Sequence, residues 1–112
     1  MGYSKIQILG NVGGNSIISE VKNKFVIKFN VAVNTKHVDS DGVISESVIW
    51  YNCSYFRPSR EKTNLAQYIR KGDHIYIEGI PVITTYLNDK KEVLLSYNVI
   101  VTQVELIGAS KS

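Results

Sequence analysis

The sequence is poor in the residues that build disulfide frameworks and metal sites. Its 112 residues include one cysteine and two histidines. An intrachain disulfide needs two cysteines, so Cys53 excludes one. A zinc site needs at least three protein ligands, and Cys53, His37 and His74 lack the close spacing of such a set. We therefore expect no metal and no other cofactor.

Long apolar runs are also absent. The longest falls far short of the roughly 20 residues that cross a bilayer. No apolar region follows Met1 to Lys5, as a secretory signal would require. These absences predict a cytoplasmic protein that has no membrane partner.

Catalytic patterns are incomplete. Ser59 to Lys62 matches the S-x-x-K element of β-lactamases, yet both companion motifs are missing. Gly10 to Gly14 lacks the Gly-Lys-Ser/Thr ending of a phosphate-binding loop. No nucleophile–base pair or carboxylate pair stands out. We therefore predict that the chain has no catalytic residues and is not an enzyme.

The length and charge indicate one modestly basic domain. A chain of 112 residues with 44% hydrophobic residues can form one core. Thirteen Lys and Arg residues against ten Asp and Glu residues give a net charge of +3 and a pI near 9.0. This excess permits a polyanionic partner but does not demonstrate one.

Short stretches with β-strand character make up most of the chain. Apolar residues occupy every second position from Phe25 to Val33, which is the period of a strand with one buried face. A short helix is expected between Ser59 and Gly72, with Ser59 as its cap. The other expected strands cover residues 5–9, 17–22, 48–56, 74–86 and 93–107.

These stretches group into three strand regions, one helix and two long strands. This order predicts an all-β fold, a five-stranded OB-fold barrel with one short helix between strands 3 and 4. Leu65 and Ile69 would close one end of the barrel. Pro81, within a strand, indicates a sheet edge or a bulge. The domain would cover residues 1–108, and 109–112 would form a short C-terminal remnant. A six-stranded sandwich decorated by a helix is the alternative.

One predicted strand carries aromatic residues on a polar face. Trp50 and Phe56 lie six residues apart and share that face with Asn52 and Ser54. Solvated aromatic rings of this kind can stack on nucleic-acid bases of any sequence. The same rings could instead pack in a core or a subunit interface, and the pattern leaves both interpretations open.

Several segments in collinear order resemble the bacterial single-stranded-DNA-binding protein family. Residues 4–13 are similar to the opening strand of the family and its Gly-Asn-x-Gly turn. Residues 29–34 and 48–56 resemble the next two strands. Residues 68–79 are similar to the family's Tyr-x-x-Lys-Gly-x-x-Val-Tyr-x-Glu-Gly signature.

The resemblance implies sequence-tolerant binding of single-stranded DNA in replication, repair or recombination. It implies four stacking positions, of which the histidine is the weakest match: Trp50, Phe56, Tyr86 and His37. Basic positions that match the family and could contact phosphates are Lys5, Arg70 and Lys71. Lys36 and Arg57 are added as phosphate contacts on their charge alone.

The chain also departs from the family pattern. Val82, Thr84 and Asn52 stand where arginine is frequent, so we predict weaker binding and a shallower salt dependence. The family's acidic C-terminal tail is not seen before Ser112, so no tail-mediated recruitment of proteins is expected.

The resemblance further implies a homotetramer, and Val99 and Val101 are consistent with an interface. Two alternatives stay open: a dimeric primosomal OB-fold protein, and an OB-like protein-interaction module that does not bind nucleic acid. RNA as the ligand is also open, because stacking alone barely distinguishes the 2′-hydroxyl.

Overall fold

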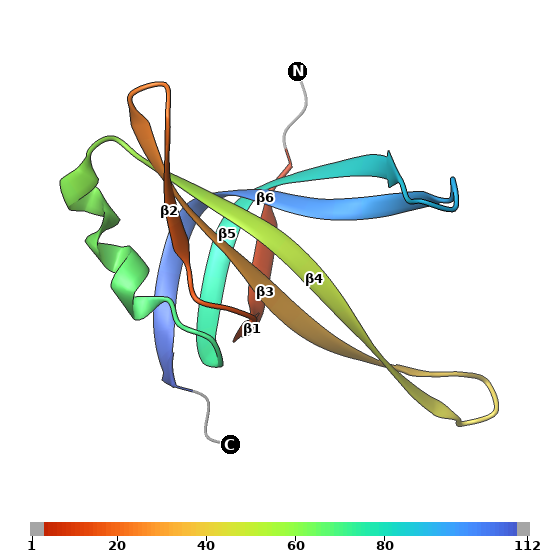
Figure 1. The fold of residues 1–112 in the computed structure, drawn as a ribbon. Coiled ribbons are helices and arrows are strands. Elements are labelled where there is room, and N and C mark those ends of the chain that lie inside the picture. The colour runs from red at the N-terminus through yellow and green to blue at the C-terminus, as the bar shows by residue number, and fades with distance from the viewer. Residues whose placement is uncertain (1–3, 110–112) are drawn as a thin grey trace.

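The computed structural model of the chain describes residues 4–109. Six strands and one 3₁₀ helix follow one another along the chain (Figure 1). They are β1 (Ile6–Val12), β2 (Ile17–Val21), β3 (Lys24–Val38), β4 (Ile44–Arg57), η1 (Arg60–Tyr68), β5 (Asp73–Leu87) and β6 (Val93–Ala109). Residues 110–112 of the expected C-terminal remnant lie outside the described residues.

Five of the strands close into a barrel. The strand order is β1-β5-β6-β4-β3-β2, and a further pairing of Asn11 with Ala32 joins β1 to β3. Neighbouring strands are antiparallel except β4 and β6, which are parallel. The closure confirms the predicted five-stranded OB fold, with η1 between the third and fourth barrel strands, and excludes the open sandwich. β2 is an additional strand that pairs with β3 outside the barrel circuit.

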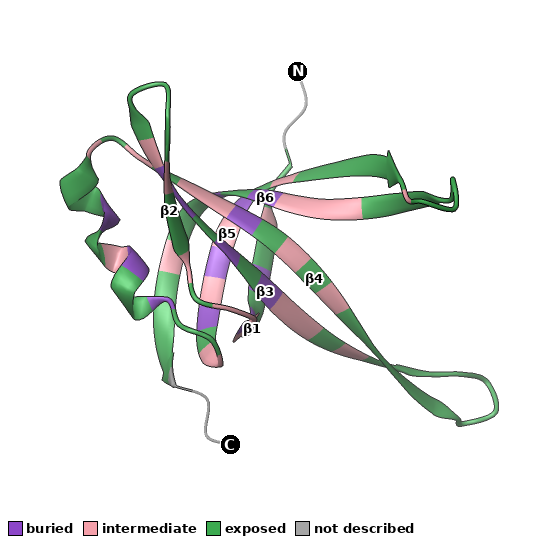
Figure 2. Cartoon of the chain, in the orientation of Figure 1, coloured by how far each residue is buried: buried purple, intermediate pink, exposed green. Residues whose placement is uncertain are grey.

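The interior of the barrel is filled by side chains from alternating strand positions. Ile27, Val31, Ile75 and Ile77 are fully buried, and the buried segments lie where the strands cross (Figure 2). Burying aliphatic side chains of this size stabilises the fold by roughly 1.5–3 kcal/mol each.

Two valines of β6 belong to this core. Val99 is 1% exposed and Val101 is 4% exposed, and β6 pairs with β5 and β4, not with the N-terminal strand. Their burial inside one barrel means that these two valines do not support the subunit interface with which the sequence was consistent. Alternation alone cannot distinguish the inside of a barrel from an apolar surface that a partner covers.

The helix η1 packs against one end of the barrel (Figure 1). Ile69, directly after it, is 1% exposed, and Leu65 packs against the core as predicted. Ser59 stands at the N-cap position, but its side chain makes no capping hydrogen bond; instead its carbonyl accepts one from the Lys62 N–H at 3.2 Å. Gly72, with φ +91°, allows the sharp exit toward β5.

Two hairpin arms extend from the barrel, one formed by β3 and β4 and one by β5 and β6 (Figure 1). β1 pairs with β5 only as far as Gly79, so Pro81 lies on an edge of β5, next to a register shift at Glu78/Gly79. This arrangement confirms the prediction that Pro81 lies at a sheet edge. At an edge, no neighbouring strand needs the backbone N–H that proline lacks.

Within residues 4–109, no helix is long and apolar enough to cross a membrane. The same residues contain no group of three or more His, Cys, Asp or Glu side chains placed to hold a metal ion.

Candidate nucleic-acid interface

The β4 strand presents aromatic rings on the side of the barrel wall that faces away from the core. Trp50 is 50% exposed and Phe56 is 48% exposed, whereas Cys53 on the opposite side is 2% exposed. We call the side that carries Trp50, Asn52, Ser54 and Phe56 the outer face. Half-exposed rings beside small polar groups can accept a stacked base without any rearrangement of the core.

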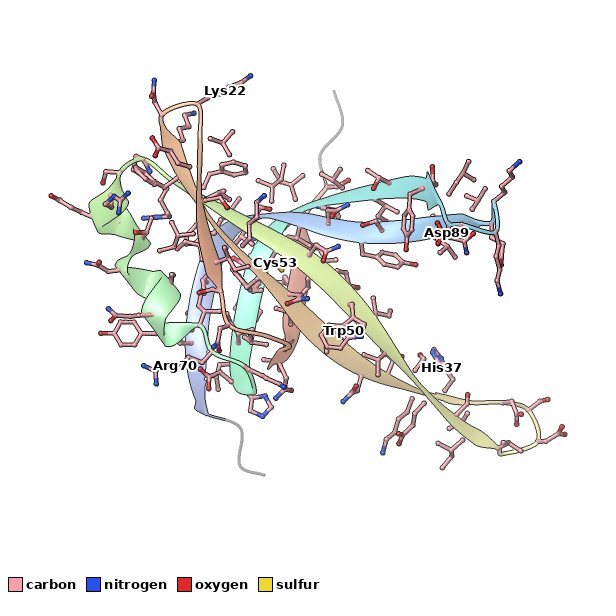
Figure 3. The ribbon with its side chains drawn as sticks, viewed as in Figure 1. Lys22, His37, Trp50, Cys53, Arg70 and Asp89 are labelled. Carbon is pink, nitrogen blue, oxygen red and sulfur yellow. The ribbon has the colours of Figure 1, made fainter. Side chains whose placement is uncertain are left out.

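Trp50 is supported by a glycine of the β1–β2 loop. Its indole lies so close to Gly13 that a Cβ atom there would meet the ring, with Cη2 only 2.8 Å away. Gly13 is itself anchored, because its N–H donates a hydrogen bond of 2.9 Å to the Asn30 carbonyl of β3. The loop therefore contacts the six-membered ring of the indole at its edge, and Trp50 stays half exposed on the outer face (Figure 3).

The outer face continues from β4 onto β6 and β5. Asn52 pairs with Asn98 across the parallel β4–β6 ladder, and Asn98 pairs with Val82 across the β6–β5 ladder. Because side chains alternate along β5 without a further register shift, Tyr86 lies on the same face as Val82. Tyr86 is 50% exposed. The structure thus places Trp50, Phe56 and Tyr86 on one continuous surface.

A shallow hollow of about 370 Å³ lies on this surface. Asn15, Asn30, Asn52 and Asn98 line it together with Lys28, whose backbone pairs with that of Ser54 on β4. Ile17, Phe29 and Cys53 add apolar lining, and among the described residues Lys28 is the one charged residue that lines the hollow.

The β3–β4 arm carries His37 beyond Trp50 (Figure 3), and Lys36 precedes it on β3. Lys36 shares the outer face and forms an exposed ion pair with Glu46 at 3.7 Å, a kind of pair that contributes little to stability. A phosphate could therefore replace Glu46 as its partner. Strand alternation places His37 on the other side of the arm from Trp50. Stacking by His37 stays a prediction.

Arg57 follows Phe56 but points to the other side of β4. Its guanidinium lies 4.5 Å from the centroid of the Tyr55 ring, a cation–π contact. Its Nε atom is buried and has no hydrogen-bond partner among the described residues. The structure therefore does not bring Arg57 onto the surface of Phe56, and its contact with phosphate is untested.

Lys5 lies beside β1, close to β5 and away from the hollow. Its Nζ atom is 3.1 Å from a carboxylate oxygen of Glu78. The pKa of Glu78 is lowered by hydrogen bonds from Gln7, from Lys5 and from Tyr76, in that order of size. Lys5 is thus held in a polar cluster on the β1–β5 surface, and its role toward phosphate stays a prediction.

Arg70 and Lys71 follow the helix and reach the loop that supports Trp50. The Lys71 N–H donates to the Asn15 side chain at 3.1 Å, and Asn15 lines the hollow. Arg70 is exposed beside the end of η1, and its Nε donates to the Gln67 carbonyl at 2.9 Å (Figure 3). The fold therefore brings these two basic residues next to the loop of Gly13 and Asn15.

Sequence reasoning missed three parts of this site. The sequence identifies Gly13 as a turn residue, but nothing in it indicates the contact with Trp50. Asn15 belongs to no motif that the sequence shows. Lys28 could have been found, because it occupies a polar position of the alternating strand that faces Ser54.

Comparison with known proteins places this geometry in a family. The family described as "Single-strand binding protein family" matches residues 3–107. The mitochondrial single-stranded DNA-binding protein of Oryctolagus cuniculus is 31% identical over 83 residues, 68% of this chain and 55% of that protein. A mitochondrial protein of the same description from Mus musculus is 28% identical over 97% of this chain and 75% of its own length. This chain thus spans about half the length of the rabbit relative.

Solved structures share the fold at lower identity. The small single-stranded DNA-binding protein of Streptomyces coelicolor matches with a TM-score of 0.75 and 17% identity over 95% of each chain. A Plasmodium falciparum SSB in complex with ssDNA matches with a TM-score of 0.70 and 20% identity over 98% of this chain and 97% of that one. At these identities the likeness supports the OB architecture.

Proposed function

Because this chain belongs to the single-strand binding protein family, we propose that it binds single-stranded DNA without strong sequence preference. Bases stack on exposed rings of the outer face, and basic side chains contact the phosphates. The family is defined by binding, and membership in it confirms the prediction that the chain is not an enzyme.

The observation that carries the proposal is the single surface shared by three half-exposed aromatic residues. Trp50 and Phe56 lie on β4, and Tyr86 reaches the same surface through the β4–β6–β5 pairing. Exposed apolar rings that share one surface are typical of an interaction site. Stacking of one base on such a ring contributes roughly 1–3 kcal/mol.

The proposal extends to the setting in which the chain acts. We infer a role in coating single strands during replication, repair or recombination, in the cytoplasm, as a homotetramer. The family membership and the relatives that are named for DNA binding support the coating of single strands. Light scattering would measure the mass of the assembly, and a dimer would favour the primosomal type of OB-fold protein.

The test uses the intrinsic fluorescence of Trp50, which is the single tryptophan of the chain. We expect oligo-dT to quench this fluorescence strongly and more weakly as salt rises. Phe56→Ala and Tyr86→Ala should each lower affinity roughly 5- to 150-fold, the equivalent of 1–3 kcal/mol.

The matched control is Tyr68→Ala. Tyr68 is 55% exposed at the end of η1, beside Arg70 and His74 and away from the outer face. Its removal should leave affinity unchanged. Absence of quenching, together with absence of binding in a filter or anisotropy assay, would refute the proposal and favour a protein-interaction module.

A further inference from the structure

We propose that a strip of uncharged side chains on the outer face hydrogen-bonds the edges of bases that lie between the stacking rings. The strip consists of Asn52, Ser96, Asn98 and Thr84, and we call it the amide strip. This inference rests on the proposed function, and it adds that part of the affinity comes from base edges and is insensitive to salt.

The amide strip runs across three neighbouring strands. Asn52 of β4 donates through Nδ2 to Ser96 Oγ of β6 at 3.4 Å. Asn98 of β6 donates through Nδ2 to Thr84 Oγ1 of β5 at 3.3 Å. The Ser96 hydroxyl and Asn98 Oδ1 are 3.5 Å apart. These four side chains therefore form a connected polar path from the hollow to the β5–β6 arm.

The hydrogen bonds inside the strip are long. Typical N–H···O distances are about 2.9–3.0 Å, whereas those of the strip are 3.3 Å or more. Long bonds between exposed groups are weak and are readily exchanged for a ligand. In its bonds to Ser96 and Asn98, Asn52 contributes its nitrogen, so its Oδ1 acceptor is available to a base.

The spacing of the aromatic rings places bases over the strip. Trp50 and Phe56 are six residues apart on one strand, which corresponds to roughly 20 Å. Stacked bases are separated by about 3.4 Å, so a base near the middle of this span cannot stack on either ring. Asn52 and Ser54 occupy the middle, and they line the hollow.

The chemistry of the strip matches a base edge better than a phosphate. An amide carries two donors and an acceptor, and a hydroxyl can both donate and accept. Each base presents adjacent donors and acceptors along its Watson–Crick edge, which single-stranded nucleic acid leaves open. A phosphate, which only accepts, would use half of this capacity.

The test compares oligo-dT with an oligonucleotide of equal length built from N3-methylthymidine. The methylated base keeps its ring and its phosphate but has lost the N3–H donor. We expect the wild-type protein to bind the methylated strand roughly 3- to 10-fold more weakly, as the loss of one or two hydrogen bonds implies. The Asn52→Ala/Asn98→Ala protein should bind both strands equally, with the wild-type affinity for the methylated strand.

A steric effect of the methyl group gives a different pattern. If the methyl group only clashed with Asn52, truncating Asn52 would not weaken binding of unmodified oligo-dT. Such a result overturns the proposal, as does equal binding of both strands by the wild-type protein. In either case oligo-dT still binds, so the proposed function survives; absence of oligo-dT binding would remove both.

Two controls complete the design. Asn64→Ala changes an exposed asparagine of η1, outside the outer face, and should preserve the wild-type discrimination. The single variant Asn52→Ala changes an exposed side chain. It should halve or abolish the preference for oligo-dT over the methylated strand, and circular dichroism should show that the chain remains folded. The loss of affinity in both Asn52 variants should be the same fold-change at every salt concentration.

Discussion

The indole of Trp50 lies directly against Gly13, at the point where the β1–β2 loop meets the outer face of β4. The contact joins residues 37 positions apart in the sequence. Gly13 has no side chain, and only for that reason can the edge of the ring lie against the loop while half of the residue stays exposed. A glycine that is remote in sequence thus decides how a tryptophan is presented.

Gly13→Ala should therefore weaken DNA binding indirectly, through the position of the Trp50 ring. A Cβ atom at this position would displace the Trp50 ring. We expect oligo-dT affinity to fall roughly 3- to 10-fold, because part of the stacking energy of one base would be lost. Fluorescence titration measures the change. Gly14→Ala is the matched control, because a Cβ atom there meets no atom nearer than Asn30 Oδ1 at 4.0 Å. Equal affinity of the two variants would show that the ring position is unimportant.

Lys28 should account for part of the salt dependence. It is the lysine that lines the hollow, so Lys28→Ala should make the slope of log K against log[salt] shallower by about 0.7, the value for one phosphate contact with a single strand. Lys62→Ala, on the exposed surface of η1, should leave the slope unchanged. Titrations at four or more salt concentrations give both slopes. An unchanged slope in Lys28→Ala would mean that this lysine meets no phosphate.

Cys53 should be inert to thiol reagents in the folded protein. It is 2% exposed in the barrel core, and burial raises the pKa of its thiol to about 12. The thiolate is the reactive form, so at pH 8 labelling should follow unfolding. The unfolded chain releases this proton near pH 9 and the folded chain only near pH 12, so stability falls as pH rises through that window. Rapid labelling under native conditions would place Cys53 at the surface.

Gly79→Ala should destabilise the barrel. A Cβ atom there would lie 2.6 Å from Val99 Cγ1 and would also meet the Ile100 carbonyl, at the register shift between β5 and β6. Overpacking of this kind typically costs 1–3 kcal/mol, and the free energy of unfolding from urea denaturation measures it. Gly14→Ala should change stability by less than about 0.5 kcal/mol. Equal stability of the two variants would mean that the strands separate easily at the bulge.

The sequence predicted those features that depend on local periodicity and on the choice of residue type. The alternation from Phe25 to Val33 and the turn residues between strands were sufficient for the order of elements along the chain, including the helix between barrel strands 3 and 4. The same alternation placed Trp50 and Phe56 on one polar face of β4. Strand geometry is repetitive, so a period of two determines which residues share a face.

Only the tertiary structure decided which faces meet. Closure of the barrel buried Val99 and Val101, which alternation alone had allowed as an interface. The parallel β4–β6 ladder aligned Asn52 with Asn98 and so joined Tyr86 to the surface of Trp50. Contacts of this kind, like that between Gly13 and Trp50, join residues far apart along the chain. They depend on how the strands close around the core, and no local pattern in the sequence records that closure.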